Sequence, residues 1–367
     1  GDNGIHVVGV AGGTERVANT ASGNAVDGIK VEAGATTTQV LGNTAGLNGV
    51  GDAVPNGFSG IAVINATDTT VGAPGAGNVS SGNTTFGIFV QDSGTTQVQA
   101  NTVGLAPDGT TARSNGESGV AVLSGGGTVV GGGSGAGNVI SANAVHGVWV
   151  TGAPGTEILG NTIGLDAAGL LGRGNGQQGV RFEGGATGTL VGRADLSDSG
   201  NRIAGNGFNG VDARGAGSGT GVLRNTVGLN AAGDAVPNGQ SGVAIIDTDM
   251  ATGGGAGDLG NRIGGNSQTG VFVRNASDGG IFGNVIGLAP DGVTSRGNGI
   301  SGVILDNATD AVVGAPGAGN VIASSAQRGV YLFGGTSGAR IQSNVIGLAE
   351  DGTTPRGTHR LVGMLYR

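Results

Sequence analysis

The sequence predicts an all-β fold, a single parallel β-helix (solenoid) of about eleven rungs, in which long and short rungs alternate and each rung has three short strands. A glycine followed by alternating aliphatic residues recurs along the whole chain at steps of 24 to 32 residues. Glycine accounts for 85 of the 367 residues, without the strict triplet of collagen. No segment has the 3.6-residue periodicity of a helix. Each repeat is too small to bury its apolar face alone, so the repeats must stack.

The leading strand of each rung begins just after the recurring glycine. In the central repeat, Gly147 is followed by Val148, Trp149 and Val150, and positions one and three after the glycine are nearly always aliphatic. Alternation with a period of two is typical of a strand with one buried face. The twelve leading glycines are Gly4, Gly28, Gly60, Gly87, Gly119, Gly147, Gly179, Gly210, Gly242, Gly270, Gly302 and Gly329.

A second and a third strand complete each rung. The third strand opens with an asparagine, as at Asn138 in a short rung and Asn161 in a long one. Long rungs then insert a polar loop, such as the one that starts at Ala106-Pro107-Asp108-Gly109, where Pro and Gly suit a tight turn. The pattern continues from end to end, so we expect one domain over residues 1–367 with no linker.

Stacked asparagines predict a structural ladder along the rod. Asparagine tolerates left-handed backbone at a bend, and its amide both donates and accepts hydrogen bonds. The alternative is a row of amides that binds a ligand, but the structural interpretation is favoured. The ladder predicted from the long rungs consists of Asn43, Asn101, Asn161, Asn225, Asn284 and Asn344.

Three phrases of the sequence resemble the repeats of bacterial right-handed parallel β-helix proteins, the pectin-lyase-like repeats of large secreted and surface proteins. They are Gly137-Asn138-Val139-Ile140-Ser141-Ala142-Asn143, Gly160-Asn161-Thr162-Ile163-Gly164-Leu165 and Asn175-Gly176-Gln177-Gln178-Gly179-Val180. The resemblance covers almost the whole chain and implies a right-handed β-helix. It does not imply one function, because that fold serves lyases, hydrolases, epimerases, adhesins, tailspikes and passive fibres.

Composition argues against several partners. The net charge is −8 and Lys30 is the only lysine, so we expect no nucleic-acid partner. Cysteine is absent, which excludes disulfides and thiolate metal sites. His6, His146 and His359 are too far apart in the stack to share one ion, so neither a metal nor a cofactor is expected. No apolar run is long enough to insert into a membrane.

The best catalytic candidates are four charged residues that interrupt the outward face near mid-chain. Arg181 and Glu183 stand two and four residues after one leading glycine, and Asp212 and Arg214 occupy the same positions in the next rung. A glycoside hydrolase needs two carboxyl groups at a set separation, and a lyase needs a base and a group that neutralises a uronate. The favoured interpretation is structural, with Arg181 paired to Asp212 and Glu183 to Arg214 across neighbouring strands.

Aromatic residues form a second candidate feature on the same outward position. Phe89, Trp149, Phe272 and Tyr331 recur at multiples of two rungs. An exposed stripe would suit sugar stacking or contact with another rod. We expect instead that the long loops, with Val54-Pro55, Leu170-Leu171 and Val236-Pro237, cover it. Leu361 and Tyr366 lie near the chain end, where we expect end-to-end contact.

The sequence alone therefore favours a bacterial structural protein outside the cell or on its surface. It would be a β-helical rod that acts as a fibre subunit or adhesin stalk through self-association, without enzyme activity. The alternative is a carbohydrate-active enzyme, or a glycan-binding adhesin module, with a polysaccharide as partner.

Overall fold

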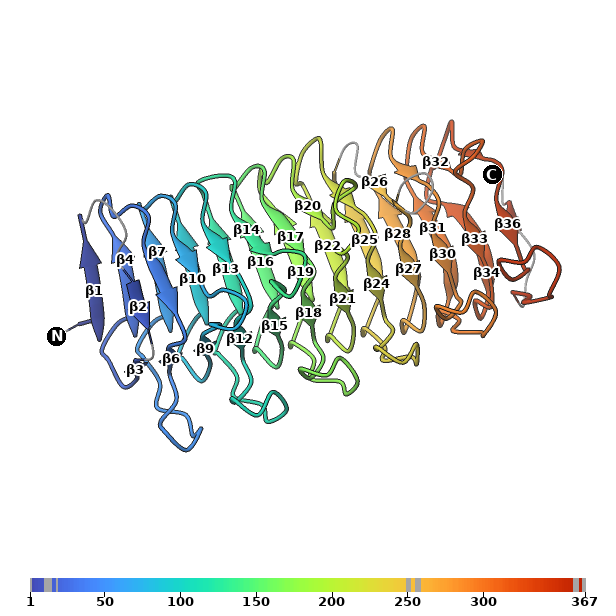
Figure 1. The fold of residues 1–367 in the computed structure, drawn as a ribbon. Coiled ribbons are helices and arrows are strands. Elements are labelled where there is room, and N and C mark those ends of the chain that lie inside the picture. The colour runs from blue at the N-terminus through green and yellow to red at the C-terminus, as the bar shows by residue number, and fades with distance from the viewer. Residues whose placement is uncertain are drawn as a thin grey trace.

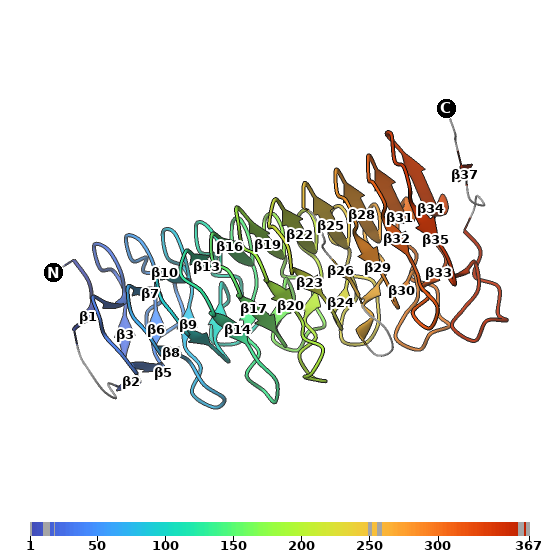
Figure 2. The ribbon, with the colours of Figure 1, turned by 90° about the horizontal axis from the view of Figure 1, so that it is seen from above.

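The structure, a computed structural model, describes residues 2–9, 15–17, 19–248, 252–254, 259–358 and 363–364. It is a long rod in which the chain winds through three parallel sheets, as Figures 1 and 2 show. The described part contains sheets of 13, 12 and 12 strands, close to the eleven rungs predicted. The all-β parallel solenoid expected from the sequence is confirmed. No helix among the described residues is long and apolar enough to cross a membrane.

Sheet A contains the leading strands, which follow the recurring glycines. Its order is β1 (Ile5–Val8), β4 (Ile29–Glu32), β7 (Ile61–Ile64), β10 (Ile88–Gln91), β13 (Val120–Leu123), β16 (Val148–Thr151), β19 (Val180–Glu183), β22 (Val211–Arg214), β25 (Val243–Ile246), β28 (Val271–Arg274), β31 (Ser301–Asp306), β34 (Arg328–Phe333) and β37 (Gly363–Met364).

Sheet B contains the second strand of each rung. Its order is β2 (Glu15–Val17), β5 (Gln39–Leu41), β8 (Thr70–Val71), β11 (Gln97–Val98), β14 (Val129–Gly131), β17 (Glu157–Leu159), β20 (Leu190–Val191), β23 (Gly221–Val222), β26 (Thr252–Gly253), β29 (Gly280–Ile281), β32 (Val312–Val313) and β35 (Arg340–Ile341).

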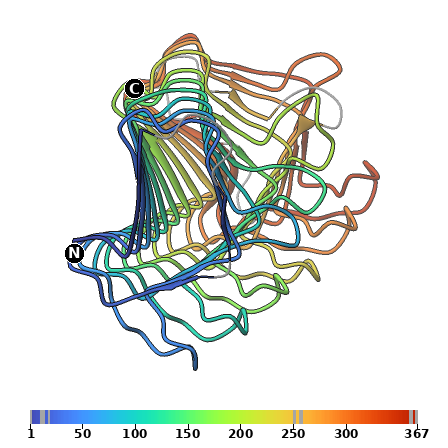
Figure 3. The ribbon, with the colours of Figure 1, turned by 60° about the vertical axis from the view of Figure 1, so that its left-hand side comes forward.

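Sheet C contains the third strand. Its order is β3 (Thr20–Ala21), β6 (Thr44–Ala45), β9 (Val79–Ser80), β12 (Thr102–Val103), β15 (Val139–Ile140), β18 (Thr162–Ile163), β21 (Arg202–Ile203), β24 (Thr226–Val227), β27 (Arg262–Ile263), β30 (Val285–Ile286), β33 (Val321–Ile322) and β36 (Val345–Ile346). In Figure 3 the strands of each sheet lie one behind another, and the long loops project from the side of the rod.

Every pair of neighbouring strands in these sheets is in register, so equivalent residues of successive rungs lie side by side. Val148 pairs with Val180 and Trp149 with Arg181, and in the next step Arg181 pairs with Asp212. The inward positions form one continuous aliphatic core along the rod, from Val7 to Val330. Phe182 is the largest side chain that is fully buried in it. The outward positions of sheet A are thereby fixed as columns that run parallel to the rod axis.

The close approach of neighbouring rungs explains why each leading strand starts after glycine. A Cβ atom on Gly147 would lie 2.5 Å from the carbonyl oxygen of Gly179 and 2.7 Å from Cγ2 of Ile163. The first of these is a backbone atom of the next rung and cannot move without breaking the ladder. The recurring glycine is thus a packing requirement of the stack.

Two asparagine ladders run inside the turns of the rod. In the first, each side-chain amide donates to the next side-chain oxygen, for example Asn138 Nδ2 to Asn161 Oδ1 at 2.9 Å. The six asparagines predicted from the long rungs belong to it, and the short-rung residues Asn78, Asn138, Asn201, Asn261 and Asn320 alternate with them. The second ladder runs from Asn24 to Asn298.

A column of buried threonines precedes the strands of sheet B and gives a stability prediction. Thr128 is buried and its hydroxyl has no hydrogen-bond partner, whereas the hydroxyl of Thr156, one rung on, donates to the Ala153 carbonyl at 2.9 Å. Because an unpaired buried hydroxyl costs about 1–3 kcal/mol, T128V should raise the free energy of unfolding by about 1 kcal/mol. The matched change T156V should lower it. Urea unfolding of both variants checks this, and a destabilised T128V would contradict it.

Candidate functional site

The most polar part of the outward face of sheet A lies on and just before β16, β19 and β22. Three outward columns meet there: the residue before each leading glycine and the second and fourth residues after it. We call eight of these nine residues, all except Thr151, the central patch: His146, Trp149, Gln178, Arg181, Glu183, Asn209, Asp212 and Arg214. The four charged candidates from the sequence all belong to it.

The ion pairs of the central patch run along the strands. Arg181 Nη2 lies 2.5 Å from Glu183 Oε2 on β19, and Arg214 Nε lies 3.5 Å from Asp212 Oδ1 on β22. The register places Arg181 beside Asp212 as expected, but the predicted pairing across the strands is wrong. Glu183 turns toward the preceding rung because the indole of Trp149 donates to its Oε1 at 3.0 Å.

Asp212 is completely buried, although it is on the outward face. Its Oδ2 accepts a hydrogen bond of 2.8 Å from the side chain of Asn209, which in turn accepts one of 3.0 Å from the backbone of Ser241 in the next rung. Asn209 thus fixes the orientation of the Asp212 carboxyl group. The sequence analysis did not identify Asn209, His146 or Gln178 as site residues. Their position directly before the leading glycines is the signal that could have found them.

Three buried polar atoms of the central patch make no hydrogen bond of good geometry: His146 Nδ1, Gln178 Oε1 and Arg181 Nε. The side chains of His146 and Gln178 are close enough for a weak hydrogen bond between them to act on the pKa of His146. His146 is 7% exposed and Gln178 is 5% exposed, and they occupy the same column on adjacent rungs. Each such atom costs about 1–3 kcal/mol unless a water molecule or a ligand pairs with it. In the same column Ser59, Ser118 and Ser301 also have unpaired buried hydroxyls, and the central patch differs in having an imidazole and two amides there.

Burial and neighbouring charges set the protonation of the central patch. Burial, together with the Arg181 guanidinium, lowers the pKa of His146 to about 4, so that the imidazole is neutral at pH 7. Burial acts to raise the pKa of Glu183, but hydrogen bonds from Arg181 and Trp149 outweigh it and hold the pKa below the usual value. At pH 7 the central patch therefore combines a neutral imidazole, an ionised Glu183 and two guanidinium groups.

The low pKa of His146 predicts acid sensitivity. The unfolded chain binds a proton at this side chain below about pH 6.5, while the folded chain does so only below about pH 4. Stability should therefore fall as the pH drops from about 6.5 to about 4, by up to about 3 kcal/mol from this group. Urea unfolding of wild type and H146Q over this range checks it. Identical pH slopes for the two proteins would contradict the prediction.

Aromatic residues continue the outward face on the N-terminal side of the central patch. Phe86 and Phe89 stack at 5.1 Å, Phe58 meets both edge-on, and Trp149 lies 6.5 Å from Phe86. Phe89 is therefore buried by other rings, whereas Trp149 is half-buried. The expected cover by the long loops is wrong, because Val54, Leu170 and Leu171 are 36%, 44% and 55% exposed.

The long loops are held against one another instead. The Arg113 guanidinium donates to the carbonyl of Gly51 at 2.7 Å, and that of Arg173 donates to the carbonyl of Thr110 at 2.7 Å, in each case one long loop back along the chain. The other aromatic candidates, Phe272 and Tyr331, are half-buried on β28 and β34. Leu361 and Tyr366 lie outside the described residues.

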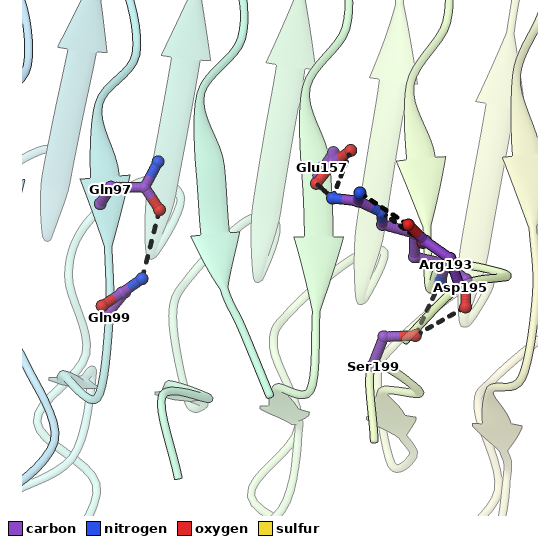
Figure 4. A network of polar contacts seen from close by, with 6 residues as sticks. All are labelled: Gln97, Gln99, Glu157, Arg193, Asp195 and Ser199. Carbon is purple, nitrogen blue, oxygen red and sulfur yellow. Dashed lines mark hydrogen bonds and ion pairs between the residues drawn. The ribbon is translucent and has the colours of Figure 1, made fainter. Parts of the chain in front are cut away.

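A second polar network lies on sheet B and the turn that follows β20 (Figure 4). Arg193 pairs with Glu157 at 3.0 Å and with Asp195 at 2.6 Å, and its backbone N–H donates to Ser199 Oγ at 2.8 Å. The hydrogen bond to Asp195, together with Glu157, raises the pKa of Arg193. None of its polar side-chain atoms is left buried without a partner, so this network is a structural clamp.

A cavity of about 410 Å³ lies at the N-terminal end of sheet A, lined by Asp2, Asn3, His6, Val26 and Lys30. It shares no residue with the central patch. Glu32 pairs with both His6 and Lys30, so these two side chains of the cavity already have a carboxylate partner. Among the residues that the structure describes, no group of three histidine, aspartate or glutamate side chains could hold a metal ion.

Comparison with known proteins gives matches among solved structures alone. No family model and no curated protein matches the chain. A solved structure of the periplasmic alginate epimerase AlgG is 13% identical with a TM-score of 0.45, and the match covers 96% of this chain and 77% of that one. The A-module of the Azotobacter vinelandii mannuronan C-5 epimerase AlgE4 is 13% identical with a TM-score of 0.39, covering 90% and 89%.

Tailspike protein 2 from the Escherichia coli O157:H7 bacteriophage CAB120 is 12% identical with a TM-score of 0.41, covering 84% of this chain and 39% of the tailspike. The likeness is one of fold alone. Against two AlgG variants the chain spans 66% and 64% of their length. The resemblance to parallel β-helix proteins is confirmed at the level of fold by the three stacked parallel sheets of the rod.

Two of the three proteins are named as epimerases, so a likeness of fold gives no reason to expect that the chain lacks enzyme activity. That expectation is dropped. The matches do not identify a reaction for this chain, which has to be argued from its own residues.

Proposed function

We propose that the chain is a carbohydrate-active enzyme whose central patch binds a carboxylate-bearing polysaccharide and removes a proton from it. The observation that carries this proposal is the group of three buried polar atoms without a well-formed hydrogen bond, on His146, Gln178 and Arg181, next to the half-buried ring of Trp149. Buried polar atoms are normally paired, and those that are not often mark a functional site. The register of β16, β19 and β22 holds all of these side chains on one rigid surface.

The protonation states favour a base-initiated reaction. The neutral imidazole of His146 can accept a proton from the carbon atom next to a sugar carboxylate, and a guanidinium group that pairs with that carboxylate stabilises the negative charge that develops. The electron pair left on the carbon then either expels the glycosidic oxygen at the β position, which takes a proton from the His146 imidazolium or from water, or accepts a proton from water on the opposite face. The first outcome is elimination and the second is inversion at that carbon.

The aromatic and amide side chains would supply binding. The half-exposed ring of Trp149 is held in place by Glu183, which makes it a preorganised surface for a sugar ring. Gln178 Oε1 can accept a hydrogen bond from a sugar hydroxyl. Asn209 acts as a positioning residue for Asp212.

The test is a turnover assay on alginate, polygalacturonate, hyaluronan and a neutral glucan. Elimination is followed by the ultraviolet absorbance of the new double bond, and inversion by proton NMR in deuterated water. We expect turnover of at least one uronate polymer and none of the glucan. Turnover of the glucan alone, or of no polymer by a folded protein, would contradict the proposal.

The remaining predictions from the sequence are expectations that no observed contact tests. They include self-association into a fibre, a role as an adhesin stalk, and the absence of a cofactor and of a nucleic-acid partner. We infer that residues 1–367 form one structural unit, supported by sheets that continue from β1 to β37. A location outside the cell would suit a polysaccharide substrate.

A further inference from the structure

The C-terminal strands of sheet A carry a second aromatic surface in the same outward columns as the central patch. On β34 the guanidinium carbon of Arg328 lies 4.1 Å from the ring centroid of Tyr331, and Tyr331 stacks on Phe333 at 5.2 Å with an interplanar angle of 14°. Arg328 directly precedes the leading glycine of its rung, and Tyr331 and Phe333 follow that glycine by two and four residues. His146, Trp149 and Thr151 have the same positions in the rung of β16. We call Arg328, Tyr331 and Phe333 the distal stack.

The distal stack is ordered but not buried. Phe333 is 39% exposed, while Arg328 and Tyr331 are half-buried. Its two rings and the guanidinium hold one another in a fixed arrangement, so little side-chain entropy would be lost when a ligand binds. Aromatic rings with an adjacent arginine suit a sugar ring that carries a carboxylate, because the ring face packs on the sugar and the guanidinium pairs with the acid.

The distance between the two sites follows from the register. From β16 to β34 the sheet takes six strand steps, which at about 4.8 Å each is about 29 Å. Phe272 lies between them on β28, with the Arg274 guanidinium carbon 4.9 Å from its ring centroid. A sugar unit is about as long as one strand step, so a straight chain of about seven units along the columns would reach from Trp149 to Tyr331.

We propose that the distal stack is a second binding subsite for the polysaccharide that reaches the central patch, so that binding favours chains of about seven units or more. This inference depends on the proposed function. It commits to one occupant, an acidic polysaccharide chain, because the distal stack continues the columns of the central patch and repeats its combination of aromatic and guanidinium groups.

The test measures the Kd of size-graded oligouronates, from dimers to decamers of whichever uronate polymer is turned over, or of alginate if none is. For wild type we expect affinity to rise at least tenfold between four and eight units. F333A and Y331A should remove this gain and leave the affinity for trimers unchanged. F208A is the matched control, because Phe208 is 40% exposed but lies on a turn outside the outward columns.

The outcomes separate the two proposals. A length-dependent gain that is lost in F333A or Y331A but kept in F208A supports the inference, even if no polymer is turned over. The inference is overturned if the affinity levels off by four units, or if the gain in affinity survives both substitutions. The proposed function still stands in either case if trimers are turned over. Failure of wild type to bind any length overturns it as well. Circular dichroism shows that each variant is folded.

Discussion

Replacing His146 with alanine should lower kcat on the uronate polymer by about 10²–10⁴-fold, the usual loss when a general base is removed. The reason is that His146 is the neutral imidazole of the central patch, with its pKa lowered to about 4 by burial and by Arg181. Binding of the polymer should change little, because Trp149 and the guanidinium groups remain. Steady-state kinetics and a separate Kd measurement check both parts.

The control for H146A is H6A. His6 is also on the outward face of sheet A, but its side chain is 40% exposed and pairs with Glu32. H6A should retain wild-type kcat. A folded H146A protein with kcat within threefold of wild type would exclude His146 as the base.

Replacing Asn138 with alanine should lower the free energy of unfolding by about 3–5 kcal/mol. The Asn138 side chain donates to the Val98 carbonyl at 2.8 Å and to Asn161 Oδ1 at 2.9 Å. Its oxygen accepts from the backbone and the side chain of Asn101 at 2.9 and 3.0 Å. The substitution removes all four bonds at a buried position, where no water can replace them.

The control for this prediction is at the other end of the ladder. Asn344 makes three equivalent bonds but is only half-buried, so water can pair with the groups that N344A leaves behind. We expect N344A to cost about 1–2 kcal/mol. Equal losses for the two variants in urea unfolding would contradict a ladder that derives its strength from burial.

The fold could be predicted from the sequence because each rung repeats the same physical requirements. Gly147 and its equivalents leave room for the carbonyl oxygen of the next rung, and alternate aliphatic residues fill the core. Asparagine side chains form the hydrogen bonds of the turns. These requirements are local, so they show in the spacing of residues. The long-rung asparagines were recognised for the same reason, although the alternation with the short-rung residues in one ladder became visible only in three dimensions.

The central patch could be predicted only in part. Arg181, Glu183, Asp212 and Arg214 stand out because four charged residues occupy the outward positions of two successive rungs near mid-chain. Their pairing could not be predicted, since it depends on how far each side chain reaches and on competition from Trp149 for Glu183. His146 and Gln178 were missed because burial and the lack of well-formed hydrogen bonds, which give them their significance, are not properties of the sequence.

The location of a bound substrate tests the central claim most directly. The inactive H146A protein should be crystallised with a uronate hexamer or octamer of the polymer that wild type turns over. We expect sugar density on the outward face of sheet A over β16, β19 and β22, with one unit against Trp149 and a carboxylate within hydrogen-bond distance of Arg181 or Arg214. Density on sheet B, on the long loops, or only at the N-terminal cavity would contradict it.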